Sequence, residues 1–299
     1  MGDVKACEKM NVDRYLERIK YSGPRPTKTD YNTLHNLCKC HSQNVAFDVI
    51  DMFGGPRKVL DLNKVYRDIV VNKRGGFCYE NNGLFCWLLK ELGFDVVILQ
   101  AQVNTSSKSF GPMFDHMTLL VTCDDGKKWL TDVGFGGNFF VLPLRFTEME
   151  EQHQPNGVYR IRKHGEEPLE YVVERAKKKV INGGKHESEA ETSTWKAGYK
   201  FDMQERSWED FQKMCDFQQD SEKSFLKNNA VTAIYTANGV AYSWGNVFYA
   251  KRYIDSYTEE ITSVKTTKSD AEFKEVLEQT IGLKLTFTPK LLFKDFPGV

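Results

Sequence analysis

The chain has 299 residues, and its 41 basic and 41 acidic side chains leave no formal net charge. This balance argues against a protein that binds nucleic acid through a basic field. No apolar run reaches the roughly 18 residues that a membrane-spanning helix needs. The length exceeds that of one ordinary hydrophobic core, so we expect two or three packed units.

The first part of the chain, residues 1 to 95, is predicted to be mainly helical. Apolar side chains recur at helical spacing in residues 15–19, 61–69 and 84–92. Asp61 stands where the second of these helices would begin. The pattern predicts an N-terminal helical bundle.

The middle part, residues 96 to 205, changes to short β-rich runs bounded by turn residues. Strands are predicted at 95–99, 117–121, 128–132, 157–161 and 169–173. Because no helix separates them, they indicate a central antiparallel β-barrel or curled sheet. The polar stretch 177–194 is predicted to be a mobile surface loop.

The last part, residues 206 to 299, contains both kinds of element. Helices are predicted at 208–217 and 270–280, and a strand at 231–235 is followed by a turn at Asn238-Gly239. We interpret this part as an interdomain helix and a smaller α/β lid. The fold class predicted for the whole chain is therefore α+β.

The seven cysteines are odd in number and scattered. Cys38-Lys39-Cys40 lacks the two-residue gap of zinc and thioredoxin-like motifs, and no second motif follows to pair with it. No signal-peptide pattern opens the chain. We therefore predict free thiols, no metal site, and a cytoplasmic protein that binds neither nucleic acid nor a membrane.

One cysteine lies in a setting that suits a nucleophile. Cys78 follows Gly75-Gly76-Phe77 and begins the third helical run. Unsatisfied N–H groups at a helix N-terminus favour a thiolate, and the glycines permit a tight turn and close approach of a second molecule. Taken alone, a buried cysteine that opens a core helix is more often a small hydrophobic residue.

Two later residues complete a possible catalytic set. His116 lies 38 residues after Cys78 and begins an apolar strand, and Asp132 lies 16 residues further on, at the end of the next strand. A hairpin turn at Asp124-Asp125-Gly126 would place both on neighbouring strands. Singly, each residue could be structural; together they predict a base beside a nucleophile and a carboxylate that holds the imidazole.

These motifs closely resemble those of the acetyl-CoA-dependent arylamine N-acetyltransferases. The resemblance is carried by Arg74-Gly75-Gly76-Phe77-Cys78, Asp115-His116 and Asp132-Val133-Gly134-Phe135-Gly136, and it extends to 11–19 and 208–211. It is similar to the eukaryotic type in the position of the 177–194 insertion. The resemblance implies a cysteine-protease or transglutaminase-like core, with Cys78 as acetyl acceptor, His116 as its base and Asp132 as the orienting carboxylate.

The resemblance also implies binding residues. Those expected at the site for a small aromatic amine or hydrazine are Phe47, Phe77, Val103, Asp115, Phe135, Gly137 and Phe139; those expected near coenzyme A are Gly111, Phe217 and Ser224. Glu222 stands where the family usually has proline. The implied protein is a monomeric acetyltransferase with ping-pong kinetics.

Two other functions use the same residues. A transglutaminase-like enzyme or thiol hydrolase carries Cys, His and Asp in this order, but its acceptor is lysine or water; the chain has no calcium-loop pattern of the Asp-x-Asp-x-Asp-Gly kind. A non-catalytic relative acting as a binding module would be expected to lack one of the three residues. Turnover of acetyl-CoA with and without an aromatic amine separates these possibilities.

Overall fold

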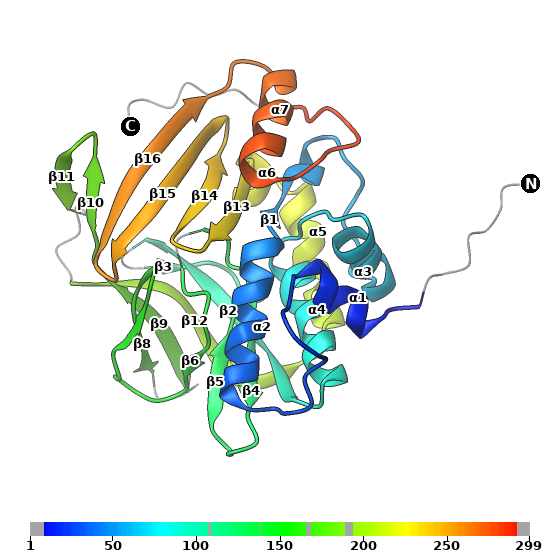
Figure 1. Ribbon diagram of the computed structural model, residues 1–299, viewed down its shortest axis with the longest axis vertical. Helices are drawn as coiled ribbons and strands as arrows, with labels where there is room; N and C mark the ends of the chain where they lie inside the picture. The colour runs from blue at the N-terminus through cyan, green and yellow to red at the C-terminus, as the bar shows by residue number, and fades with distance from the viewer. Residues whose placement is uncertain (1–8, 107–108, 138, 166–168, 189–193, 292–299) are drawn as a thin grey trace, which may run out of the picture.

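A computed structural model describes residues 9–106, 109–137, 139–165, 169–188 and 194–291. The fold is α+β, as predicted. Helices α1 to α4 gather on one side, a β-barrel lies opposite them, and a second sheet packs above the barrel (Figure 1).

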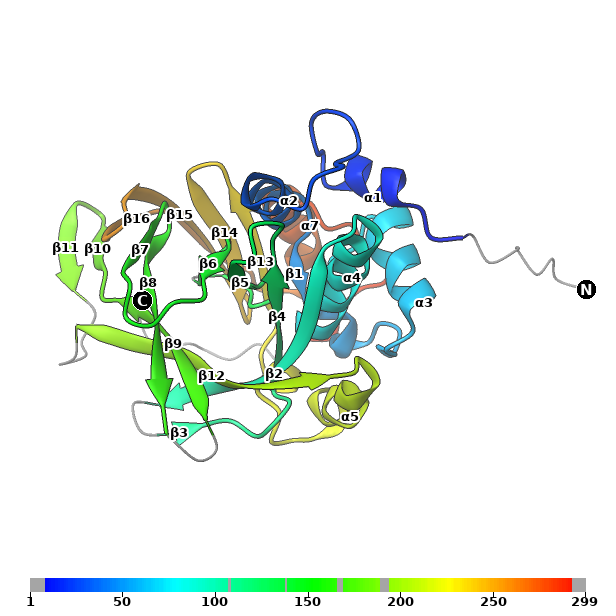
Figure 2. The ribbon, with the colours of Figure 1, turned by 90° about the horizontal axis from the view of Figure 1, so that it is seen from below.

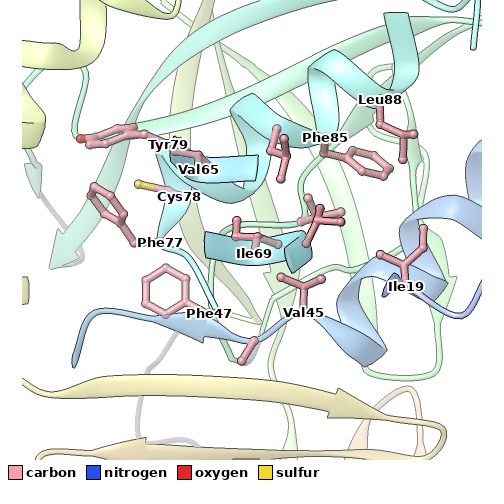
Figure 3. Packing of buried hydrophobic residues seen from close by; sticks show 14 of the residues in the cluster. Ile19, Val45, Phe47, Val65, Ile69, Phe77, Cys78, Tyr79, Phe85 and Leu88 are labelled. Carbon is pink, nitrogen blue, oxygen red and sulfur yellow. The ribbon is translucent and has the colours of Figure 1, made fainter. Parts of the chain in front are cut away.

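The helical part follows local signals in the sequence. The side chains of Asn11 and Asp61 accept hydrogen bonds from the first turns of α1 and α3, as N-cap residues do. α4 is buried nearly all round, and its side chains Leu84, Phe85 and Leu88 are fully buried. Phe85 and Leu88 point into the core beside Ile69 and Ile19 (Figure 3). The bounds are α1 Val12–Arg18, α2 Tyr31–Asn44, η1 Ile50–Phe53, α3 Leu62–Tyr66, η2 Arg67–Val71 and α4 Cys78–Glu91.

The central sheet is an antiparallel barrel that is nearly closed. Its strands run in the order β6-β5-β4-β2-β12-β9-β8-β7, and β3 pairs with β2. The side chain of Gln152 in β7 bonds to both backbone groups of Arg145 in β6, which joins the two end strands. The bounds are β2 Asp95–Ser106, β3 Ser109–Phe110, β4 His116–Thr122, β5 Lys128–Thr131, β6 Leu144–Arg145, β7 Gln152–Gln154, β8 Gly157–His164, β9 Glu170–Ala176 and β12 Trp195–Arg206.

Helix α7 packs on the second sheet (Figure 1), and the ring centroids of Phe273 in α7 and Phe248 in β15 lie 5.0 Å apart. Its strand order is β1-β13-β14-β15-β16-β10-β11. The bounds are β1 Phe47–Asp48, β10 Lys179–Asn182, β11 Lys185–Ser188, η3 Glu209–Phe211, α5 Gln212–Asp220, α6 Phe225–Asn228, β13 Val231–Thr236, β14 Gly239–Trp244, β15 Val247–Asp255, β16 Thr258–Thr266 and α7 Asp270–Ile281. None of the described helices is long and apolar enough to cross a membrane.

The prediction of a loop at 177–194 is wrong for most of that stretch. Strands β10 and β11 form a hairpin there, and β10 runs parallel to β16. The turn uses Gly183 and Gly184 at positive φ, and the ammonium of Lys178 is buried against Glu259 at 2.8 Å. Residues 189–193 lie outside the described residues.

Strand β10 joins the second sheet although its residues belong to the predicted barrel part, and β1 joins it from the predicted helical part. The division at residues 95 and 205 therefore remains a prediction.

Helix α4 lies alongside β4 and β2 (Figure 2). The segment that follows β12 also contacts this helix: the Trp208 indole donates to the carbonyl of Tyr79 at 3.0 Å and packs on Gly83. A Cβ at Gly83 would lie 2.6 Å from the indole nitrogen, so this contact requires glycine. α4 is thus held by both the barrel and the C-terminal part.

A buried ion cluster fixes the first turn of α4. The Lys58 ammonium lies 3.0 Å from carboxylate oxygens of both Asp51 and Glu80, and Glu80 accepts a hydrogen bond from the backbone of Phe77. The backbone of Lys58 also bonds to Gln219 of α5. The two neighbouring carboxylates raise the pKa of Lys58 against the effect of burial, so the lysine is charged.

We predict that Lys58→Met lowers the free energy of unfolding by about 3–5 kcal/mol, because it leaves the buried carboxylate of Glu80 without a cation and leaves Asp51 with Arg74 alone. Urea denaturation measures the change. The control is Lys127→Met, which breaks an exposed pair with Asp125 and should cost less than about 0.5 kcal/mol. Equal effects of the two substitutions would contradict a role for the cluster in stability.

Candidate active site

Cys78 is the first residue of α4 and is 4% exposed. It lies with Phe77, Tyr79 and Phe47 around it (Figure 3). The preceding turn passes close to the 46–48 segment: a Cβ at Gly75 would lie 2.6 Å from the carbonyl oxygen of Ala46. The glycine therefore permits the backbone approach that places the cysteine.

His116 and Asp132 come together across the β4–β5 hairpin. His116 begins β4, Asp132 follows the last residue of β5, and the two strands pair in antiparallel register. The Nε2 atom of His116 lies 2.6 Å from Oδ2 of Asp132, and both side chains are buried. Since Nε2 is engaged, Nδ1 is the imidazole nitrogen that can exchange a proton with another group.

A fourth residue, Asn82, holds the carboxylate. Its amide nitrogen donates to Oδ1 of Asp132 at 2.9 Å, and its oxygen accepts from the backbone of Val133 at 2.9 Å. The backbone of Gly134 donates to the same Oδ1 atom. Asn82 lies one helical turn after Cys78, and this spacing, which places both on one face of α4, was the signal that could have revealed it.

Burial raises the pKa of the Cys78 thiol well above its usual value, and the carboxylates of Asp115 and Asp132 raise it further. The backbone N–H of Tyr79 in the first turn of α4 acts in the opposite direction and lowers the pKa of this thiol. The expectation that Cys78 is held as a thiolate remains a prediction.

Cys78 and His116 open onto one cavity of about 620 Å³. Its lining is mostly apolar and aromatic. Six of the residues predicted to bind an acceptor line it: Phe47, Val103, Asp115, Phe135, Gly137 and Phe139. Phe225 lines it as well, and so do four apolar or aromatic residues of the C-terminal part that the sequence did not suggest: Leu226, Val231, Tyr242 and Trp244.

The other predicted binding residues lie outside this lining. Phe77 is completely buried and packs edge-on against Tyr79. Ser224 is buried, and its hydroxyl donates to Gln218. Gly111 lies directly beside Asp115, and Phe217 lies in α5. Their contact with coenzyme A remains a prediction.

The six cysteines within the described residues are free thiols, and Cys7 lies outside these residues. Across the same ranges, no group of three or more His, Cys, Asp or Glu side chains is arranged to hold a metal ion.

Residues 30–290 match the model of a family described as N-acetyltransferase. Arylamine N-acetyltransferases are among the similar proteins: the pineal gland isozyme of Gallus gallus is 28% identical, with 92% of this chain and 95% of the relative covered. Arylamine N-acetyltransferase 1 of Homo sapiens is 27% identical with the same coverage.

Solved structures share the fold. The Mycobacterium marinum arylamine N-acetyltransferase in complex with CoA has a TM-score of 0.76 at 23% identity, covering 91% of this chain and 93% of its own. The Salmonella typhimurium arylamine N-acetyltransferase has a TM-score of 0.77 at 22% identity, covering 92% of each chain.

The fold and the family match together define an acyltransferase enzyme with a cysteine-protease-like core. The chain belongs to the arylamine N-acetyltransferase family.

We predict that His116→Gln moves the pH dependence of Cys78 alkylation upward. In the wild type the imidazole accepts the proton, so the inflection should lie below the value of about 8.5 for a free thiol. Without the imidazole, burial and the two carboxylates remain, and the inflection should lie above about 8.5.

Iodoacetamide rates between pH 5 and 10, with Cys78→Ala used to subtract the other thiols, give both inflections. An inflection that stays in place in His116→Gln would show that another group ionises Cys78.

Proposed function

We propose that this protein transfers an acetyl group from acetyl-CoA, through a thioester on Cys78, to the amino group of an arylamine or hydrazine. The observation that carries the proposal is the opening of the Cys78 thiol and the His116 imidazole onto one aromatic cavity, with Nε2 of the imidazole held by Asp132 at 2.6 Å. The CoA complex of the Mycobacterium marinum relative supports coenzyme A as the donor's carrier.

In the first half-reaction His116 takes the proton of Cys78. The thiolate attacks the acetyl carbonyl carbon, a new C–S bond forms to Sγ, and the bond to coenzyme A breaks. The leaving thiolate takes the proton from the imidazolium. One thioester replaces another of similar energy, so the acetyl group keeps its transfer potential.

In the second half-reaction the acceptor amine attacks the acetyl carbon of Cys78. A C–N bond forms and the C–S bond breaks, while His116 takes the proton lost by nitrogen and returns it to the Cys78 thiolate. Asp132 orients the imidazole and stabilises its charged form throughout. The apolar lining suits a flat aromatic acceptor that is neutral at pH 7. We further propose a monomer that acts in the cytoplasm.

We predict that acetyl-CoA alone adds one acetyl group to the protein, and that Cys78→Ala abolishes the adduct. Intact-protein mass spectrometry detects it, and initial rates with varied donor and acceptor should give the parallel lines of a ping-pong mechanism. Cys215→Ala removes a different buried thiol and should leave the adduct intact. A ternary-complex rate law without an adduct would exclude this mechanism, and rapid release of free acetate would favour a hydrolase.

We predict that Asp132→Asn lowers the rate of acetyl transfer by orders of magnitude, up to about 10⁴-fold as in serine-protease triads. The amide cannot stabilise the imidazolium, although it fills the same space. Circular dichroism and urea denaturation show how much of the variant is folded. Near-normal turnover by the folded fraction would assign Asp132 to the scaffold.

A further inference from the structure

Asp115 places a carboxylate in the lining of the cavity, and the mechanism above gives it no task. It precedes His116, lines the same cavity as Cys78, and is only partly exposed. Among the described residues, no lysine or arginine forms an ion pair with it; its side-chain partner is the neutral amide of Gln218, whose Nε2 donates to Oδ1 at 2.9 Å. A carboxylate removed from water without a cation is costly.

The amide is fixed in the orientation that serves this carboxylate. The hydroxyl of Ser224 donates to Oε1 of Gln218 at 2.6 Å, so the NH₂ group of the amide faces Asp115. Both Gln218 and Ser224 are buried. The α5–α6 segment thus presents a hydrogen-bond donor to Asp115 but no positive charge.

The backbone before Asp115 is held in an uncommon conformation. Phe114 has a φ of 64°, and its carbonyl accepts a hydrogen bond from the Tyr79 hydroxyl at 2.7 Å while its N–H donates to Gln100. A Cβ at Gly111 would lie 2.3 Å from Oδ2 of Asp115, so a side chain there would displace the carboxylate. Three elements, α4, β2 and α5, therefore position Asp115.

This carboxylate works against the nucleophile, because after burial it is the largest cause that raises the pKa of Cys78. Its negative charge does not assist attack on a thioester. What it does favour is a positive charge within the cavity, close to the amine that attacks Cys78. The neighbouring imidazolium of His116 and a cationic acceptor are the two charges that it could serve.

We infer that Asp115 binds the ammonium group of a protonated aralkylamine, and so extends the acceptors beyond the arylamines and hydrazines proposed above. This inference rests on the proposed acetyl transfer through Cys78. Asp115 takes one proton from the ammonium group, which leaves a neutral amine and a carboxylic acid. The amine then attacks acetyl-Cys78, and its second proton passes through His116 to the departing thiolate. The carboxylic acid returns its proton to water after the product leaves.

The rest of the cavity fits the aromatic end of such an acceptor. Phe47, Phe135 and Phe139 line it, and the ring of Phe135 meets the His116 imidazole at 5.1 Å. Aromatic faces also attract cations, so these three rings do not oppose an ammonium group that reaches Asp115. Three basic side chains, Arg175, Lys196 and Lys251, line the same cavity, and Asp115 is the group that would offset their repulsion.

The test compares benzylamine, which is protonated at neutral pH, with aniline, which is not. We expect the wild type to acetylate both, and Asp115→Asn to lower kcat/KM for benzylamine relative to aniline by about 10- to 100-fold, the loss of a charge-assisted hydrogen bond. Acetylation of Cys78 by acetyl-CoA alone should not slow in this variant. Asp124→Asn removes the same charge from an exposed turn and should leave the ratio unchanged.

Three results would overturn the inference: no acetylation of benzylamine by a wild type that acetylates aniline, an equal loss for both acceptors, or slower acetylation of Cys78. The last two would mean that Asp115 serves His116. If acetyl-CoA leaves no adduct on wild-type Cys78, the proposed function fails instead, and binding still tests the cation site. The wild type should bind benzyltrimethylammonium about 10- to 100-fold more tightly than neutral neopentylbenzene, and equal binding would refute the site.

Discussion

The structure depends on the hydrogen bonds that Asn82 makes from α4 to the segment after β5. They join the helical part to the barrel at the point where the carboxylate of Asp132 is hydrogen-bonded to the imidazole of His116. Cys78 lies one turn earlier on the same helix, so a single rigid element sets both the thiol and the support for the base. A small shift of α4 relative to the barrel would move Cys78, the proposed nucleophile, away from His116, its proposed base, and catalytic geometry tolerates little such error.

The contacts that prevent this shift are buried ion pairs, whose charged groups cost free energy to remove from water. Lys58 is buried between Asp51 and Glu80, and Arg74 spans Asp48 and Asp51 behind the same turn. An apolar core of the same volume could be equally stable. An ion cluster differs from an apolar core because each charged group is stabilised only when its partners lie in a few specific positions. In this protein it fixes the N-terminal turn of α4 against the 48–58 segment and, through the backbone of Lys58, against α5.

The parts of the site that could be predicted are those with local signals. Cys78 stands at a helix start. His116 and Asp132 lie on one hairpin, so their spacing alone brings these two side chains near one another. The cavity wall could not be predicted in the same way. Tyr242 and Trp244 reach it only because β14 belongs to a sheet that packs against the barrel. No pattern in the sequence around them predicts that they lie near Cys78.

The fold was predictable to a similar extent. The change from helical to strand period gave the α+β class, because alternation and helical spacing are local properties. The β10–β11 hairpin was missed because its residues are polar and its partner, β16, is far away in sequence. The burial of Lys178 against Glu259 makes such a polar strand possible, and an ion pair between segments so far apart leaves no trace in either one.

The two carboxylates near His116 show how position in the fold, not residue type, assigns a chemical task. Asp132 accepts hydrogen bonds from the imidazole, from Asn82 and from the backbone of Gly134, and it is not among the residues that line the cavity. Asp115 accepts hydrogen bonds from Gln218 and from the backbone of Val103, and it lines the cavity. A carboxylate outside the lining can orient a neighbouring side chain but does not meet a ligand in the cavity. A carboxylate within the lining can do so, and this difference separates the proposed support of the base from the inferred recognition of the acceptor.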